Sequence, residues 1–600
     1  MKRRIPAAKA LEMVMEQHDS SDDDDSLEGD VDCCTLREAA DVAASDSRSV
    51  NVVILPPATV DAVSDEEAGD DDDLSPSSLP AEVAGPLVVH FHNDADREKN
   101  EMTKMSSGKR LKSKKVSVPK WKKQFVYKEH LVNKEITTLS ELRPELASKT
   151  PYELFRLYYD DDMRHLIMTE SVKYARQKNN QKISADECDL DVFIGILILS
   201  GYHSLPREHL YWSRDEDLDV SYVSSRMSRN RFEDLKRYLH LADNSCIDGT
   251  DKLHKIRPFV NHCNAKLQQH GVFSQYLSID EQMVPYFGHH SAKMYIRSKP
   301  IRFGFKLWVL ASDSGYPYYF IVYCGKSADT NSDQVKEVGL GHTVVTSLLS
   351  IFSSPECHEV FFDNYFTSYD LLSYLKSIKI KATGTARENR LKQCPLQDTK
   401  LMKKTPRGTH DSKCDGVVGV VKWHDNQCVT VATNYDSVDT VGKVKRWSVA
   451  KKAAIEVPQP TVVNSYNCHM GGVDMLDAFM ANYRPTFRSK KWWWPLFLNG
   501  VNMLVVAAWK LHVEVGGKFD QLAFRRYIVR SLMHSVNTSA PSAGPGPRPL
   551  DEIRRDGLNH HLSRNDKQAR CRLCMKNCRM KCTKCDVPLH IHCELDYHAQ

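Results

Sequence analysis

The order of β-like and helical segments between residues 275 and 385 constrains the fold more than any other feature. Three β-like runs come first, YLSID, RFGFKLWVLAS and YPYYFIVYCG. A helical segment (TVVTSLLSIF), a strand (HEVFFDN), a second helix (SYDLLSYLKSI) and a last strand (IKATGTA) follow. Runs of β-branched and aromatic residues indicate strands, whereas apolar residues spaced by three and four indicate helices. The order β-β-β-α-β-α-β predicts a mixed sheet with helices on its faces.

That order is compatible with an RNase H-like domain, so we expect a multidomain α/β protein built around one. Apolar residues at helical spacing before and after it predict mostly helical flanking segments. Short β-like pieces such as GVVGVVKWHD and CVTVATNY predict a β-rich insertion. The expected divisions are 1–134 (disordered and acidic, with a basic segment at 104–123), 135–271 and 483–536 (helical), 272–385 and 461–482 (RNase H-like), 386–460 (insertion), 537–565 (linker) and 566–600 (cysteine-rich).

Charge is distributed unevenly along the chain. Residues 1–100 carry 25 acidic and 8 basic side chains, a net of −17, and the remainder has a net of +21. The acidic runs cannot bury enough apolar surface to offset chain entropy, so we expect disorder there. The segment KRLKSKKVSVPKWKK (109–123) predicts nuclear localisation or a phosphate-contacting arm, with a charged linker as the plainer alternative. A basic body with an acidic tail favours a nucleic-acid partner.

No segment predicts a membrane span. The apolar run that begins at Val192 is too short to cross a bilayer and is typical of a core helix. The first residues, MKRRIPAAKALEMVMEQ, contain no apolar stretch of the kind that a secretory signal requires. We therefore expect a protein without a membrane partner.

Six of the 17 cysteines lie within residues 571–593. Paired C-x2-C spacings followed by H-x2-C predict zinc, which would supply folding free energy to a segment with little core of its own. We expect two interleaved sites. The first uses Cys571, Cys574, His590 and Cys593; the second uses Cys582, Cys585 and His598, with Cys578 or His592 as the eighth ligand.

Four aspartates have unusual surroundings. Asp280 ends YLSID and Asp363 ends HEVFFD, so both follow apolar strands. Asp474 and Asp477 follow a glycine pair in YNCHMGGVDMLDAFM and would project from one helical face. A buried acid needs a cap, a cation or a metal. Carboxylates are ligands that Mg²⁺ prefers, so the four could hold two ions about 3.5–4 Å apart for phosphodiester attack, although each alone also fits a turn or a cap.

A resemblance to a known family implies a role for these four aspartates. The chain resembles the piggyBac transposase family, including its domesticated members in animal genomes, over roughly 135–600. The matching segments are PYELFRLYYDDDMRHLI, SRNRFEDLKRYLHLADN, LSIDEQMVPYFG, IRSKPIRFGFKLW, FFDNYFTSYDLL, ATGTARENR, YNCHMGGVDMLD and the cysteine-rich tail. The resemblance implies that Asp280, Asp363 and Asp474 are the catalytic aspartates, with Asp477 as a fourth acid and Mg²⁺ or Mn²⁺ as cofactor.

The same resemblance implies the reaction and the partners. A nuclear homodimer would nick double-stranded DNA at transposon terminal repeats, form hairpins and join the freed ends to TTAA targets. The helical segments would serve dimerisation and DNA binding, and the cross-braced zinc domain would read the repeats. Residues expected at the DNA are Arg387, Arg390, Lys299, Arg302 and Trp494, the last as a stacking platform.

The alternative hypothesis is a domesticated, catalytically silent protein that binds DNA and acts on chromatin or transcription. The complete set of four acids favours the enzyme, because carboxylates beside phosphates would repel DNA unless metal ions lay between them. A reader of protein partners through the zinc domain is a third, weaker hypothesis.

Overall fold

A computed structural model provides the coordinates. The described residues are 31–33, 49–54, 87–92, 119–128, 130–131, 141, 143–178, 180, 186–246, 249, 251–271, 273–296, 301–325, 339–437, 441–448, 452–534 and 554–599. The chain divides into two compact units. One unit comprises Met1–Ser204 and Leu235–Met533; the other comprises Leu205–Asp234 and His534–Gln600.

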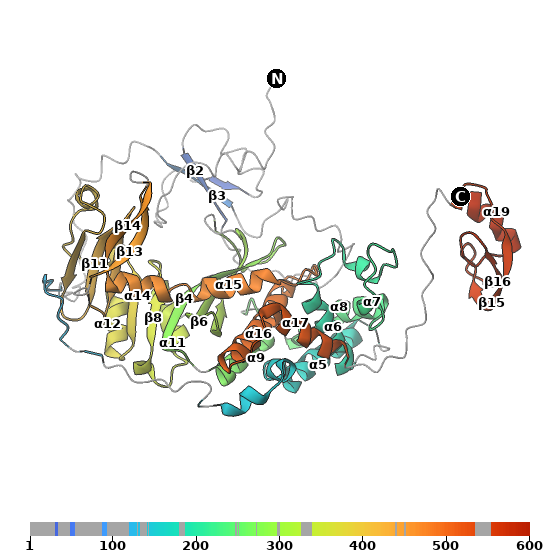
Figure 1. The fold of residues 1–600 in the computed structure, drawn as a ribbon, viewed down its shortest axis with the longest axis horizontal. Helices are drawn as coiled ribbons and strands as arrows, with labels where there is room; N and C mark the ends of the chain where they lie inside the picture. Colours follow the sequence, from blue (N-terminus) through green and yellow to red (C-terminus); the bar gives the residue numbers. More distant parts are fainter. Residues whose placement is uncertain are drawn as a thin grey trace, which may run out of the picture. The chain divides into compact units, whose positions relative to one another are not determined.

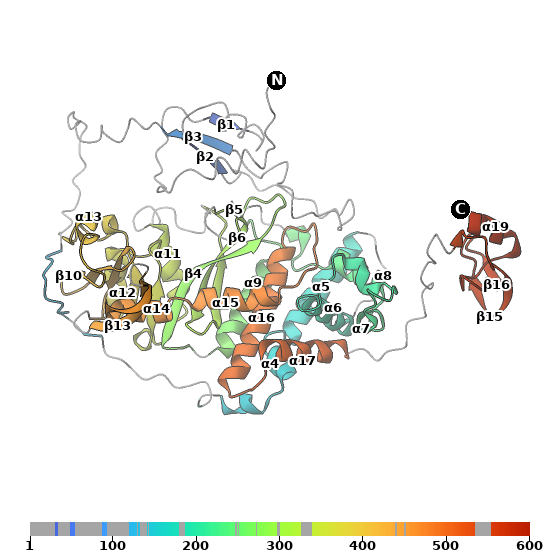
Figure 2. The ribbon, with the colours of Figure 1, turned by 45° about the horizontal axis from the view of Figure 1, so that its top comes forward.

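The centre of the first unit is a nine-stranded mixed sheet (Figure 1). Its strands are β4 (Tyr276–Pro285), β5 (Lys293–Tyr295), β6 (Phe303–Ser312), β7 (Pro317–Val322), β8 (Glu359–Phe362), β9 (Lys381–Thr385), β10 (His410–Cys414), β11 (Gly419–His424) and β12 (Cys428–Thr433). Their order is β10-β11-β12-β9-β8-β4-β6-β5, with β7 also paired to β6, so β10 and β5 lie at opposite ends (Figure 2). β8 runs parallel to β4 and β9, and the other pairs are antiparallel.

Helices connect the strands and cover the sheet. α11 (Leu340–Leu349) lies between β7 and β8 in the chain, and α12 (Tyr369–Ser377) lies between β8 and β9. α14 (Thr461–His469) contacts β4, β9 and β12, and α15 (Gly472–Asn482) contacts β4 and β6. The predicted order of elements from β4 to β9 is confirmed, with the short β5 as an addition that the sequence did not indicate.

Residues 386–460, which the sequence predicts as a β-rich insertion, contain five strands in their described part. Of these, β10, β11 and β12 extend the central sheet, since Val431 on β12 pairs with Thr385 on β9. Only β13 (Val441–Ser448) and β14 (Ala453–Pro460) form a separate two-stranded ribbon. β12 pairs with the edge of β9 that β8 leaves open, because the backbone N–H and C=O groups of a buried strand need hydrogen-bond partners. The short helices here are 3₁₀ Glu388–Arg390 and α13 (Thr399–Met402).

Folded structure also begins earlier than residue 135. Lys122 forms a β-bridge with Cys414, and Phe125 and Tyr127 are buried in a cluster with residues of β11, β12 and α14. The basic segment therefore ends inside the fold, and its residues before 119 lie outside the described part of the chain. Three strands, β1 (Val31–Cys33), β2 (Ser49–Ile54) and β3 (Leu87–His92), form an antiparallel sheet within the range that we expected to be disordered.

Helices from two distant parts of the chain pack together. α16 contacts α4 and α9, and α17 contacts α4 and α6. Their bounds are α4 (Pro151–Arg156), α5 (Asp161–Gln177), α6 (Glu187–Leu199), α9 (Arg257–His270), α16 (Trp494–Glu514) and α17 (Gln521–Met533), with 3₁₀ turns at Pro144–Ser148, Asn244–Cys246 and Pro355–Cys357. Capping boxes at Thr150 and Asp186 start α4 and α6.

α16 is the one helix among the described residues that is long and apolar enough to cross a membrane. Its apolar stretch is 78% buried inside the protein, as in the core helix of a globular domain.

The second unit contains two segments. Leu205–Asp234 includes a 3₁₀ helix (Glu208–Trp212), α7 (Ser221–Ser224) and the first part of α8 (Arg229–Tyr238). The other segment includes β15 (Leu562–Arg570), β16 (Asn577–Cys582) and α19 (Ile591–Ala599). The core of this C-terminal part consists of cysteines together with Val587, Leu589 and Tyr597.

Candidate active site and metal centres

Two of the predicted aspartates lie side by side on neighbouring parallel strands, Asp280 in the middle of β4, which continues to Pro285, and Asp363 just past the end of β8. Ile279 on β4 pairs with Phe362 on β8, so the next residues, Asp280 and Asp363, continue the same row. Adjacent strands lie about 4.8 Å apart. Asp280 accepts a hydrogen bond from its neighbour's backbone N–H (2.7 Å), and Asp363 accepts one from the backbone N–H of Tyr365 (2.9 Å). Two half-exposed carboxylates are therefore fixed in adjacent positions on two central strands of the sheet.

α15 brings the third aspartate over the same strand. The backbone N–H of Val473 donates to the hydroxyl of Ser278 (3.1 Å), which lies two residues before Asp280 on the same face of β4. A Cβ at Gly472 would lie 2.1 Å from the carbonyl oxygen of Ser312, so only glycine permits this approach. Asp474 is exposed in the first turn of α15, where the helix dipole stabilises a negative charge.

Tyr466 on α14 reports the convergence of the three acids. Burial raises the pKa of its hydroxyl to about 12, against a hydrogen bond with Thr385 that lowers it. The negative charges of Asp363, Asp280 and Asp474 raise this pKa further. The pKa of this one hydroxyl is therefore raised by carboxylates at β4, at the end of β8 and on α15, which are far apart in the sequence.

Asp477 lies one helical turn beyond Asp474 and has different neighbours. Its carboxylate accepts a hydrogen bond from the side-chain amide of Gln282 (2.5 Å), and Gln282 in turn accepts one from Asn499 (2.9 Å). Burial lowers the pKa of Arg484, and the charge of Asp477 partly offsets that effect. Asp477 thus connects α15 to β4 and α16 as well as adding charge near the row.

The predicted DNA-contacting residues have different environments. Arg387 is exposed, whereas Arg390 is half-buried and donates to the carbonyls of Asn364 (3.1 Å) and Tyr365 (2.5 Å). Arg390 therefore holds the loop that follows Asp363. Arg302 is exposed beside β6, and Lys299 lies outside the described residues.

Lys306, a basic residue on β6 near Arg302, is buried. Its ammonium pairs with Glu281 (2.5 Å) and lies 3.9 Å from the ring centre of Trp308. The ion pair holds β6 against β4 next to Asp280, and the contact with Trp308 lies within β6, so the charge of Lys306 is used within the fold.

The prediction that Trp494 is a stacking platform is wrong for this structure. Its side chain is 1% exposed, and the indole N–H donates to the carbonyl of Phe487 (2.9 Å). Trp493 is fully buried, and Trp492 stacks on His290 with ring centres 3.9 Å apart. An apolar helix start needs large side chains to fill the core, which explains all three tryptophans.

The first predicted zinc site is present as a group. Cys571, Cys574, His590 and Cys593 place one ligand atom each within 4.8 Å of the others. Nδ1 of His590 lies 3.3 Å from Sγ of Cys574 and 4.0 Å from Sγ of Cys593, as on the edges of a tetrahedron around zinc. Its other nitrogen, Nε2, lies 3.1 Å from the carbonyl of Asn577, which orients the ring.

The second group corrects the eighth ligand. Cys582, Cys585 and His598 are joined by His560, not by Cys578 or His592. Nδ1 of His560 lies 3.4 Å from Sγ of Cys582 and 3.5 Å from Sγ of Cys585.

The two rejected ligands have other surroundings. The thiol of Cys578 donates a hydrogen bond to the carbonyl oxygen of Met580 (3.6 Å), and the ring of His592 stacks on the ring of His590. The folded tail therefore begins before residue 566, within the predicted linker 537–565.

The donors of both groups suit a soft divalent ion. Nδ1 of His598 donates to the carbonyl of Arg554 (2.9 Å), and its buried Nε2 has no hydrogen-bond partner, as expected of a ligand atom. Burial acts to raise the pKa of the Cys571 thiol, but hydrogen bonds from the backbone of Cys574 and His590 outweigh it and lower the pKa to about 6. A thiolate at neutral pH is the form that binds metal.

Comparisons with known proteins give the class. A family model described as Transposase IS4 matches residues 150–509. The mixed sheet, the acidic row and this match define a protein of the transposase class. The chain is 33% identical over 598 residues to human "PiggyBac transposable element-derived protein 3", covering 94% of this chain and 99% of the relative.

Two further comparisons agree. Human "PiggyBac transposable element-derived protein 2" is 32% identical over 559 residues, covering 89% of this chain and 91% of the relative. The fold matches a structure titled "Cryo-EM structure of piggyBac transposase synaptic complex with hairpin DNA" with a TM-score of 0.57 at 21% identity, covering 75% of this chain and 98% of that one. The chain belongs to the piggyBac family of transposases and transposable element-derived proteins.

Proposed function

We propose that this chain is a DNA transposase whose catalytic carboxylates are Asp280, Asp363 and Asp474, with Asp477 as a supporting acid. The proposal is supported by the adjacent register of Asp280 within β4 and Asp363 just past β8, by the hydrogen bond that holds the start of α15 against β4, and by the effect of all three charges on Tyr466. The strand order β7-β6-β4-β8-β9, with β8 parallel to both neighbours, supports an RNase H-like core.

The donor set suits divalent ions that prefer oxygen, Mg²⁺ or Mn²⁺. When bound, a pair of such ions activates a nucleophile and stabilises the leaving oxygen in phosphodiester attack. Two ions about 3.5–4 Å apart spread their ligands more widely than one ion does. Among the described residues, the aspartates do not form a group as tight as the two Cys/His groups.

The chain's own residues position the DNA. Arg387 is exposed just past the end of β9, next to the row of acids, where a guanidinium can hold phosphate with two donors. Lys299 and Arg302 are proposed as further phosphate contacts. Arg390 fixes the backbone after Asp363 and so sets the angle of that carboxylate.

The partners follow from the family. We infer a nuclear homodimer that binds transposon ends through the C-terminal zinc domain, forms hairpins and joins to TTAA targets. The structural neighbour's title names hairpin DNA, which supports the hairpin step.

The test uses purified full-length protein, Mg²⁺ or Mn²⁺, and duplexes carrying the ends of the genomic element flanked by TTAA. Wild type should nick and form hairpins. Asp280→Asn, Asp363→Asn and Asp474→Asn should each bind the ends but lose at least about a hundredfold in cleavage, the order expected when charge stabilisation is removed. Asp477→Asn should lose less, because its carboxylate also bonds Gln282.

Two outcomes would reject the enzyme. One is cleavage by the Asp280→Asn, Asp363→Asn and Asp474→Asn triple variant. The other is specific binding of the true ends without cleavage by wild type, which would establish the domesticated DNA-binding protein instead.

A further inference from the structure

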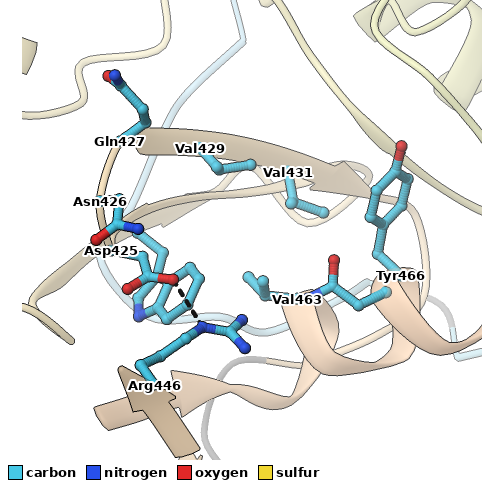
Figure 3. Close-up of a pocket in the computed structure, with 10 residues that line it drawn as sticks. Asp425, Asn426, Gln427, Val429, Val431, Arg446, Val463 and Tyr466 are labelled. Carbon is cyan, nitrogen blue, oxygen red and sulfur yellow. Dashed lines mark hydrogen bonds and ion pairs between the residues drawn. The ribbon is translucent and has the colours of Figure 1, made fainter. Parts of the chain in front are cut away.

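A pocket of about 240 Å³ lies between β12, the β13–β14 ribbon and α14 (Figure 3). Nothing in the catalytic arrangement above uses it. Its lining residues are Trp423, Asp425, Asn426, Gln427, Val429, Val431, Arg446, Val463, Tyr466 and Asn467.

The lining combines apolar walls with neutral polar groups. Val429, Val431 and Val463 are the aliphatic walls, and the ring of Tyr466 stands at one end (Figure 3). The amides of Asn426, Gln427 and Asn467 are exposed at the rim. Such a set suits a flat, neutral ligand with hydrogen-bonding edges, since aliphatic and aromatic surfaces pack against its faces and amides reach its edge.

The charges at the pocket are already paired. Nε of Arg446 lies 2.9 Å from Asp425, and Arg407 pairs with the same carboxylate from outside the pocket. Two guanidinium groups on one carboxylate leave a net charge of +1 at this end of the pocket. The pocket therefore disfavours a metal cation and suits an uncharged ring system whose attached phosphate lies near the excess positive charge.

The pocket lies on the same row of the sheet as the catalytic acids. Asp280 and Asp363 continue the β4–β8 register, Thr385 follows on β9, and β9 pairs Thr385 with Val431 on β12. Three strand spacings, on the order of 14 Å, thus separate Asp280 from the pocket wall. Tyr466 connects the pocket to the catalytic acids, because its side chain lines the pocket and the charges of the three aspartates act on its hydroxyl.

We propose that this pocket holds one unpaired nucleobase of the DNA strand that is being cut, an inference that rests on the proposed function. A strand running across the row from Asp280 and Asp363 reaches the pocket within a few nucleotides. A base that leaves the stack loses its partners, and aromatic, aliphatic and amide groups replace them. Held there, the base fixes the register of the strand relative to the acids.

The test uses two probes with wild-type protein in buffer without divalent ions. One is a DNA hairpin with unpaired 2-aminopurine or 4-thiothymine next to the stem, and the other is a fully paired duplex of equal length. Val429→Phe fills the pocket from a half-buried position, and Asn426→Ala with Gln427→Ala removes two exposed rim amides without touching the core. Gln269→Ala removes an exposed amide on α9 as the matched control.

Irradiated 4-thiothymine should cross-link to Tyr466 or to residues of β12, as read by peptide mass spectrometry. Both pocket variants should weaken hairpin binding about tenfold, the order expected for one stacked base, and leave duplex binding unchanged, as should the control. Cross-links only elsewhere, or equal losses on both probes, would overturn the proposal. Because neither readout requires cleavage, an inactive wild type would reject the proposed function while the pocket is still tested.

Discussion

Single residues decide how closely α15 approaches the sheet. The two glycines before Asp474 are equivalent in the sequence, but they have different surroundings in the structure. A Cβ at Gly472 would meet the carbonyl oxygen of Ser312 at 2.1 Å and the hydroxyl of Ser278 at 2.5 Å, whereas a Cβ at Gly471 would meet nothing within 4 Å. Only the second glycine is required by packing, and it sets the position of the neighbouring aspartate.

This difference gives a matched pair of variants. Gly472→Ala should destabilise the protein by about 1–3 kcal/mol, since backbone must move to relieve the clash, and should lower cleavage by displacing Asp474. Gly471→Ala should change neither property by a measurable amount. Denaturant unfolding and end-cleavage rates check both variants, and equal effects from the two would contradict the packing argument.

At the scale of elements, the two Cys/His groups tie short strands and a helix into one fold. His560 reaches the second group from before β15, and its Nε2 lies 3.0 Å from the carboxylate of Asp556. A hydrogen bond from Lys584 lowers the pKa of Asp556 to about 2, so this carboxylate stays charged and keeps the ring oriented. The metal-binding fold therefore needs the stretch before residue 566.

His560→Ala should reduce bound zinc from two ions per chain to one, because three remaining ligands hold the ion weakly. His592→Ala should retain both ions, since that ring lies outside both groups. Native mass spectrometry of the full-length protein measures the stoichiometry. Loss of an ion in the second variant, with none lost in the first, would restore the ligand predicted from spacing.

On the scale of the whole molecule, the chain has separate cores with different sources of stability. The sheet and its helices bury large aliphatic and aromatic side chains, whereas the C-terminal core is mostly cysteine. A core so small would gain folding free energy from metal ions held by its two Cys/His groups. The two should therefore respond differently when zinc is removed.

A strong zinc chelator should abolish the folding of the C-terminal part and leave the thermal transition of the sheet body within about a degree, because the two have separate cores. Hydrogen exchange read by peptide mass spectrometry distinguishes the parts. Binding to transposon ends should weaken, and readdition of Zn²⁺ should restore it. A matching loss of protection in β4 and β8 would show that the sheet body also depends on zinc.

Local features of the fold and the site could be predicted from the order of residues. Periodicity indicated the order of elements from β4 to β9, apolar strands ending in Asp280 and Asp363 indicated the acids, and C-x2-C spacing indicated two metal groups. These features depend on residues that are close together in the sequence, so the spacing typical of a strand, a helix or a metal-binding turn shows them directly.

Only the tertiary structure decided the long-range pairings. It placed β10–β12 on the open edge of β9, buried Trp494, supplied His560 as the missing ligand, and put Tyr466 between the acids and a pocket. No local pattern specifies these contacts, because each joins segments that are far apart in the sequence. They form where distant segments bury apolar surface and satisfy each other's backbone groups.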